Sequence, residues 1–84
     1  MCICDLEPGQ QAIVTAVSAH GAVRQRLLDM GLLRRARVSV ARYAPFGDPV
    51  WVRIGGTQLA LRRQEAEAVL VDCGGYAGSP RGSI

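Results

Sequence analysis

Residues 37–61 read RVSVARYAPFGDPVWVRIGGTQLAL and decide the fold. In residues 37–43 and again in 50–54, branched aliphatic side chains occupy every second position, at 38 and 40 and then at 50, 52 and 54. This period of two is that of a strand with one buried face. Gly55-Gly56 supplies the positive φ angles of a tight hairpin, so residues 57–61 return as the partner of the strand before them. The stretch therefore predicts three strands, the last two joined in a hairpin.

The loop between the first two strands, residues 44–49, reads APFGDP. Each proline pushes the residue before it toward extended backbone, so the loop has a restricted backbone conformation and is not a flexible linker. It is either a rigid turn, in which Asp48 bonds nearby backbone and Gly47 relaxes the chain, or a recognition loop with Phe46 at its tip. Two prolines would lower the entropy lost when such a loop docks. The sequence leaves both interpretations open.

Toward the N-terminus, residues 10–18 (QQAIVTAVS) are rich in β-branched side chains and predict a further strand. A short helix is expected next, between Gly21 and Gly31, because Val23, Leu27 and Met30 follow one another at i, i+4 and i+7. A helix of about ten residues does not persist alone in water, so its apolar face has to dock.

Toward the C-terminus, residues 62–68 (RRQEAEA) suit one helical turn and residues 69–71 a last strand. From Cys73 onward glycine, serine and proline dominate, which indicates a disordered tail. We therefore expect one domain over residues 1–72 and a tail over 73–84. Five short strands with one short helix after the first hide their edges best by curling into a small barrel, so the fold class is mainly β.

The chain has 84 residues and a net charge of +3, and all ten of its basic side chains are arginines. A chain this short buries only about 60% of its unfolded surface, which excludes a large multistep enzyme. The single histidine, the lack of lysine and the lack of a phosphate-binding or nucleophile motif predict that the protein is not an enzyme. No apolar run approaches the length that spans a bilayer, and no secretory signal is recognisable, so we expect a cytoplasmic protein.

Four side chains are candidate ligands of a thiophilic or borderline metal: Cys2, Cys4, His20 and Cys73. Their spacing does not match a zinc knuckle, and we expect the Cys-x-Cys pair to lie on a mobile terminus. The sequence therefore predicts no cofactor and no intramolecular metal site. Weak or adventitious transition-metal binding, or a cysteine-bridged dimer, stays open.

Three motifs occur together in one order: RLLDMGL at residues 26–32, the loop at 44–49, and LALRR at 59–63 followed by Glu65-Ala66. In order and separation they resemble the FeoA family, over residues 5–72. The resemblance implies a small cytosolic protein with an SH3-like barrel, needed for ferrous-iron uptake by the bacterial membrane transporter FeoB, which carries a cytosolic G-protein domain. The same domain is found at the C-terminus of metal-dependent repressors related to the diphtheria toxin repressor.

On this resemblance we expect an accessory protein that binds a FeoB-type transporter, at its G domain or close to the membrane, and modulates its activity. Contact with the membrane would then occur only through the partner, and a homo-oligomer stays open. Leu27 is either core or part of an exposed groove beside the barrel, flanked by arginines. Candidate partner-binding residues are Arg24, Arg26, Leu27, Met30, Phe46, Asp48, Arg62 and Arg63.

Three other functions are compatible with a small β-barrel. A nucleic-acid module would need a clustered basic face with stacking aromatics, whereas four aromatics and seven interspersed acids predict no nucleic-acid partner. A small soluble metal-binding protein would use the N-terminal cysteines. A stand-alone relative of the repressor domain would keep the fold without the transporter.

Overall fold

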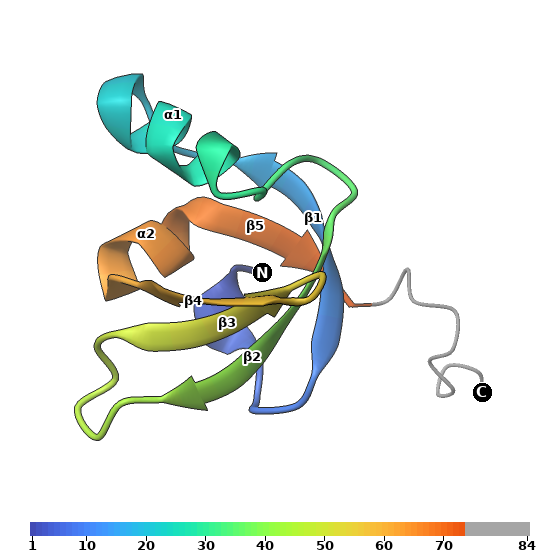
Figure 1. Ribbon diagram of the computed structural model, residues 1–84, viewed down its shortest axis with the longest axis vertical. Helices are drawn as coiled ribbons and strands as arrows, with labels where there is room; N and C mark the ends of the chain where they lie inside the picture. Colours follow the sequence, from blue (N-terminus) through green and yellow to red (C-terminus); the bar gives the residue numbers. More distant parts are fainter. Residues whose placement is uncertain (74–84) are drawn as a thin grey trace.

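The computed structural model describes residues 1–73, and its centre is one curled antiparallel sheet of five strands in the order β4-β3-β2-β1-β5 (Figure 1). The elements in chain order are η1 (Ile3–Asp5), β1 (Gln11–Val17), α1 (Gly21–Asp29), β2 (Arg37–Tyr43), β3 (Val50–Ile54), β4 (Thr57–Leu61), α2 (Arg63–Ala68) and β5 (Val69–Asp72). The α2 helix lies beside β4, and η1 packs against α2 and β5. Neighbouring strands thus curl around one core.

The predicted strands and helix are confirmed. The three strands expected from residues 37–61 coincide with β2, β3 and β4, and the flanking strands agree with β1 and β5 to within one residue at either end. The helix after the first strand is α1, and the single helical turn before the last strand is α2. The mainly β fold class therefore follows from the period of two, because that period places one row of side chains inside the curled sheet.

The core consists of the inward-facing rows of the strands. Val40 of β2 lies opposite Val52 of β3 in the sheet register, and both are fully buried. Burying each such side chain contributes about 1.5–3 kcal/mol. The other buried apolar side chains come from every strand, both helices and the N-terminal turn: Ile3, Leu6, Ala12, Val14, Leu27, Leu32, Val38, Val50, Leu61, Ala66, Val69 and Val71.

The expectation that the N-terminus is mobile is wrong. Ile3 is fully buried and Leu6 nearly so, and the carbonyl oxygen of Met1 accepts a hydrogen bond of 2.8 Å from the backbone N–H of Val71. The Tyr43 hydroxyl lies 3.3 Å and 3.2 Å from the carbonyl oxygens of Ile3 and Cys4 and closer still to that of Leu6, to which it donates. Two apolar side chains in the first six residues therefore draw the terminus onto the core.

Neither helix of residues 1–73 has the length and apolarity needed to cross a bilayer. Of the tail predicted over residues 73–84, the structure describes only Cys73, which is half-buried beside the core. The remainder lies outside the described residues, so the boundary between domain and tail stays a prediction.

Candidate functional site

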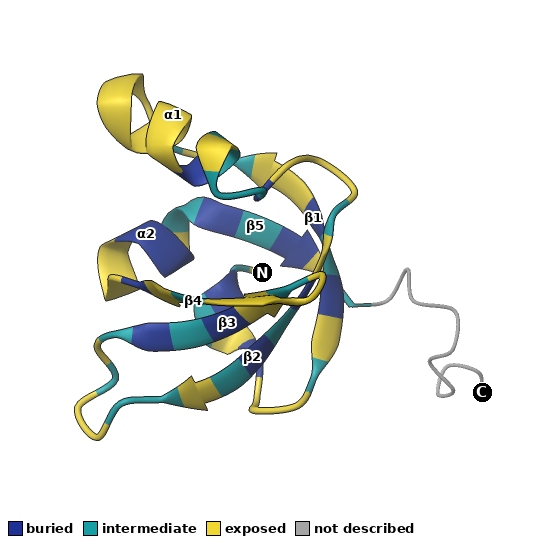
Figure 2. Cartoon of the chain, in the orientation of Figure 1, coloured by how far each residue is buried: buried dark blue, intermediate teal, exposed yellow. Residues whose placement is uncertain are grey.

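The α1 helix carries three of the predicted partner-binding residues, and a fourth, Met30, follows it directly as its C-cap. The placement of the helix corrects one of these four. Leu27 is fully buried and is the only buried residue of the helix, so it belongs to the core and is not an exposed docking side chain. Val23, on the same predicted stripe, is 48% exposed, and Met30 is half-buried. Figure 2 shows that most of α1 faces solvent. The stripe therefore docks at Leu27 and Met30 and is exposed at Val23, because the start of the helix projects beyond the barrel.

Besides Leu27, an ion pair holds α1 in place. The guanidinium of Arg26 donates from Nη1 to Oε2 of Glu65 on α2. The other carboxylate oxygen of Glu65 accepts a hydrogen bond of 2.9 Å from the backbone N–H of Arg62, which caps the first turn of α2. Glu65 is the one buried charged residue of the described chain, so both of its oxygens are satisfied where water is excluded.

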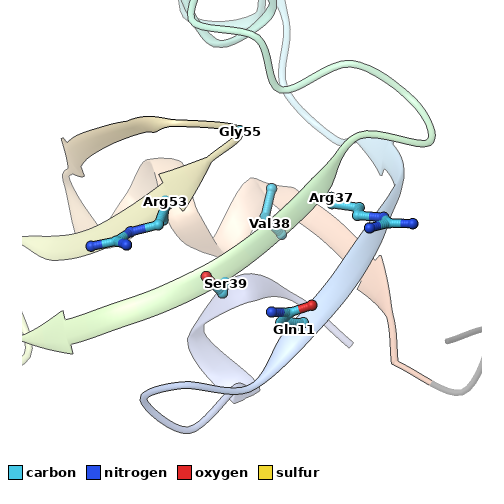
Figure 3. A pocket seen from close by; sticks show the side chains of 6 residues that line it. All are labelled: Gln11, Arg37, Val38, Ser39, Arg53 and Gly55. Carbon is cyan, nitrogen blue, oxygen red and sulfur yellow. The ribbon is translucent and has the colours of Figure 1, made fainter. Parts of the chain in front are cut away.

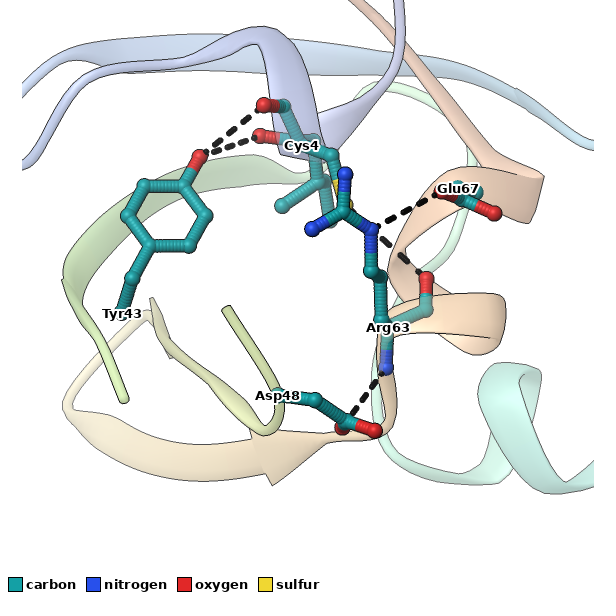
Figure 4. Close-up of polar contacts among 6 residues, drawn as sticks. Cys4, Tyr43, Asp48, Arg63 and Glu67 are labelled. Atoms are coloured by element: carbon teal, nitrogen blue, oxygen red, sulfur yellow. Dashed lines mark hydrogen bonds and ion pairs between the residues drawn. The ribbon is translucent and has the colours of Figure 1, made fainter. Parts of the chain in front are cut away.

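A second set of contacts joins the proline loop to α2 (Figure 4). The carboxylate of Asp48 accepts a hydrogen bond of 3.1 Å from the backbone N–H of Arg63. The side chain of Arg63 turns back over the loop, since a Cβ placed on Gly47 would lie 2.8 Å from its Nη1 atom. Its Nε atom also donates to Glu67 over 3.2 Å. Asp48 therefore bonds backbone as the rigid-turn interpretation expects, but across the fold rather than within the loop.

These contacts bring the three sequence motifs to one end of the barrel. We call this region the junction and define it by Arg26, Asp48, Arg62, Arg63 and Glu65. Its rim carries Phe46, which is 95% exposed at the tip of the loop, next to the Gly47 that the Arg63 side chain covers. The junction thus holds a large aromatic side chain out into solvent on an anchored loop. Arg24 is also exposed on α1, although no contact ties its side chain to the junction.

The four candidate metal ligands are not gathered at one site, although the thiols of Cys2 and Cys4 are neighbours. The Cys4 thiol lies 3.9 Å from the carbonyl oxygen of Arg63. Burial raises the pKa of Cys4 from 9.0 to about 11, helped by the neighbouring Cys2 and Glu67, so this thiol stays protonated near neutral pH and is a poor ligand. The Cys73 sulfur accepts from the Gln10 side chain over 3.3 Å, and His20 stands at the start of α1. In residues 1–73, no three histidine, cysteine or acidic side chains are grouped as a metal would require.

Two residues of this region were missing from the candidate set, Glu65 and Glu67. The signal for Glu65 was its position three residues after Arg62, where a glutamate caps the helix start. The signal for Glu67 was its spacing of four from Arg63, which favours an ion pair on a helix surface.

Comparison with known proteins identifies the family of this chain. The model of the FeoA domain family matches residues 1–73. The chain belongs to the FeoA domain family. The FeoA match covers all of the described residues, so the junction, the loop and both helices are parts of the family domain.

Individual relatives agree with the FeoA assignment. The solution structure of FeoA from Chlorobium tepidum is 46% identical, with a TM-score of 0.81, and the match covers 87% of this chain and 70% of that one. The crystal structure of Stenotrophomonas maltophilia FeoA complexed with zinc, described as an SH3 domain protein, is 32% identical with a TM-score of 0.78, over 88% of this chain and 92% of that one. The SH3-like fold is thereby confirmed.

A curated relative carries the domain within a longer chain. It is the Fe(2+) transport protein A/Fe(2+) transporter FeoB fusion protein of Porphyromonas gingivalis, 35% identical over 72 residues. The match covers 86% of this chain but only 8% of the relative, so this chain spans a small part of that protein's length.

Proposed function

We propose that this protein is an accessory protein of ferrous-iron transport, which binds the cytosolic part of a FeoB-type transporter and modulates its activity, and which catalyses no reaction itself. The observation that carries the proposal is the fusion of a homologous domain to the transporter in the Porphyromonas gingivalis protein. Fusion holds two partners at a high effective concentration, an arrangement that is useful when the two act together.

The junction supplies a surface suited to such binding. Phe46 is a fully displayed aromatic anchor, and aromatic anchors dominate the energy of protein interfaces. The hydrogen bond between Asp48 and the Arg63 backbone orders the loop before any partner arrives, so less entropy is lost on docking. The exposed guanidinium groups of Arg62 and Arg63 lie at the rim, where charge guides encounter more than it adds affinity.

The proposal needs no resident cofactor and places the protein in the cytoplasm, in contact with the membrane only through the transporter. Ferrous iron is the cargo of the partner. Within residues 1–73 the donor set does not fit a bound metal ion, because no three ligating side chains are grouped and the Cys4 thiol holds its proton. The modulation would therefore act through docking.

The test is co-purification of the tagged protein with full-length transporter from detergent-extracted membranes, beside an unrelated tagged SH3-like barrel as control. The transporter should be enriched by this chain and not by the control. Equal recovery of the transporter by both baits would overturn the proposed function.

A further inference from the structure

Four of the five strands of this fold carry no negative charge. The first four strands, β1 to β4, contain no aspartate or glutamate, and they carry three arginines, Arg37, Arg42 and Arg53. The seven carboxylates of the chain lie in the N-terminal turn, the helices, the loops and β5: Asp5, Glu7, Asp29, Asp48, Glu65, Glu67 and Asp72. The sheet therefore has a basic region whose own strands supply no acidic side chain.

The register places polar side chains of four strands in one row across the outer face of the sheet. Gln11 lies opposite Ser39, Ser39 opposite Arg53, and Arg53 opposite Gln58. Their neighbours along the strands, such as Val38 and Val52, are buried, so the row itself faces outward. Arg53 donates to Gln58 over 3.2 Å, which fixes its guanidinium along the row.

An aromatic side chain lies beside this row. Trp51 is half-buried, and Arg42, its partner in the register, places its guanidinium 5.1 Å from the centre of the indole ring. The other neighbour of Trp51 in the register is Ala60, which has only a small side chain. The ring and its arginine thus form a flat, positively charged surface next to the polar row.

Between these side chains the surface is hollowed. A depression of about 260 Å³ is lined by Gln11, Arg37, Val38, Ser39, Arg53 and Gly55. Figure 3 shows Arg37 and Arg53 at opposite ends of it, with Ser39 and Gln11 between them. The Ser39 hydroxyl and the Gln11 amide lie along the hollow, and the guanidinium groups of Arg37 and Arg53 point outward from its two ends (Figure 3). None of the lining residues is a carboxylate, and hydroxyl, amide and guanidinium groups are donors that suit a carboxylate ligand.

We propose that this sheet face, defined by Gln11, Ser39, Arg42, Trp51 and Arg53, binds an acidic segment of a protein partner, with one carboxylate of that segment on the Arg53 guanidinium and its neighbouring apolar atoms on Trp51. None of these residues belongs to the junction, so the inference does not rest on the proposed function. A nucleic acid fits less well, because successive bases need several stacking platforms and this face has one aromatic ring.

The probe is a short synthetic peptide in which glutamate alternates with glycine, and its matched control has glutamine in place of each glutamate. Trp51 is the sole tryptophan of the chain, so its fluorescence reports directly on this face. The acidic peptide should change the fluorescence saturably and shift the backbone NMR signals of β2 and β3, while the glutamine peptide does neither. Because exposed ion pairs are screened, binding should weaken as salt is raised.

Two variants locate the site. Arg53→Gln should weaken binding of the acidic peptide about fivefold, the size expected for one charged hydrogen bond at a surface. Arg34→Gln removes the same charge from an exposed position outside the sheet and should leave the affinity unchanged. Both side chains are exposed, so both variants should keep the wild-type melting temperature.

Three results would each overturn the inference. The first is equal binding of the acidic and glutamine peptides. The second is an equal loss of affinity in Arg53→Gln and Arg34→Gln, which would assign the binding to net charge alone. The third is no response to the acidic peptide together with Arg53-dependent binding of oligothymidylate or of phosphatidylserine vesicles, which would give this face to another class of partner.

Discussion

The two helices of this domain differ sharply in how they are held. The α1 helix has nine residues and buries one, Leu27, whereas the α2 helix has six residues and buries two, Glu65 and Ala66. The shorter helix also receives contacts from α1, from the proline loop and from η1. Helix stability here depends on docking and not on length. The α2 helix is therefore the element to which the other parts of the junction attach, and α1 is a peripheral helix attached through Leu27 and Arg26.

The largest effect is expected from removing the one buried side chain of α1. Leu27→Ala should lower the free energy of unfolding by about 2–5 kcal/mol, because it leaves a cavity in the core. The measurement is urea denaturation followed by circular dichroism. Val23→Ala, one turn earlier on the same stripe but exposed, is the control and should change stability by less than about 0.5 kcal/mol. Similar losses from the two variants would mean that α1 docks by its whole stripe.

The second effect concerns the ion pair between the helices. Glu65→Gln should cost about 1–3 kcal/mol, since a buried carboxylate that satisfies two donors is lost. After that change, adding Arg26→Gln should cost little more, because the two side chains act through one contact. A double-mutant cycle in urea measures the coupling. Additive losses would contradict the attachment of α1 through Arg26.

The strands and the α1 helix also differ in how much of their placement the sequence predicts. The strands in residues 37–61 were predicted correctly because strict alternation leaves one choice of buried face, as in Val38, Val40 and Val52. The helix was located correctly as well. How far α1 lies from the barrel was not predictable from its own period, since Val23 and Leu27 share a stripe and yet differ in exposure.

The candidate site was predicted in part. Arg26, Asp48, Arg62 and Arg63 were singled out from separate motifs, but nothing local to any motif indicates that Glu65 pairs with Arg26 or that the Asp48 carboxylate binds the Arg63 backbone. Those contacts span distances of 15 and 39 residues along the chain and exist only once the barrel closes. The ordered N-terminus escaped prediction for the same reason, because Ile3 and Leu6 find their partners on other elements.

A smaller effect tests how the proline loop is attached to α2. Gly47 has a φ of 81° and Gly9 a φ of 88°, so alanine at either position should cost about 1 kcal/mol from backbone strain. Only at Gly47 would the new Cβ meet the Arg63 guanidinium. The Nε–H NMR signal of Arg63 should therefore shift in Gly47→Ala and stay in place in Gly9→Ala. An unchanged signal in both would show that Arg63 does not cover the loop.

The last effect is confined to alkaline pH, where stability should depend on the protonation of groups close to α2. Burial raises the pKa of Cys4 from 9.0 to about 11 and raises the pKa of Tyr43 as well. A raised pKa means that the folded chain holds the proton more tightly than the unfolded chain, so the stability is fully present below about pH 9 and is lost toward pH 11. Cys4→Ser should flatten this decline in urea titrations, leaving the part due to Tyr43. An identical pH dependence in the variant would show that the Cys4 thiol does not cause the decline in stability.

The central claim is that the junction binds the transporter through its exposed aromatic anchor. The most direct measurement is the affinity for full-length FeoB-type transporter in lipid nanodiscs, by biolayer interferometry, of the wild type, Phe46→Ala and Leu33→Ala. Phe46 is 95% exposed, and Leu33, which is not one of the junction residues, is 53% exposed, so neither change should disturb the fold. We expect Phe46→Ala to weaken binding more than about tenfold while Leu33→Ala binds as the wild type does. Wild-type affinity in Phe46→Ala would contradict the claim.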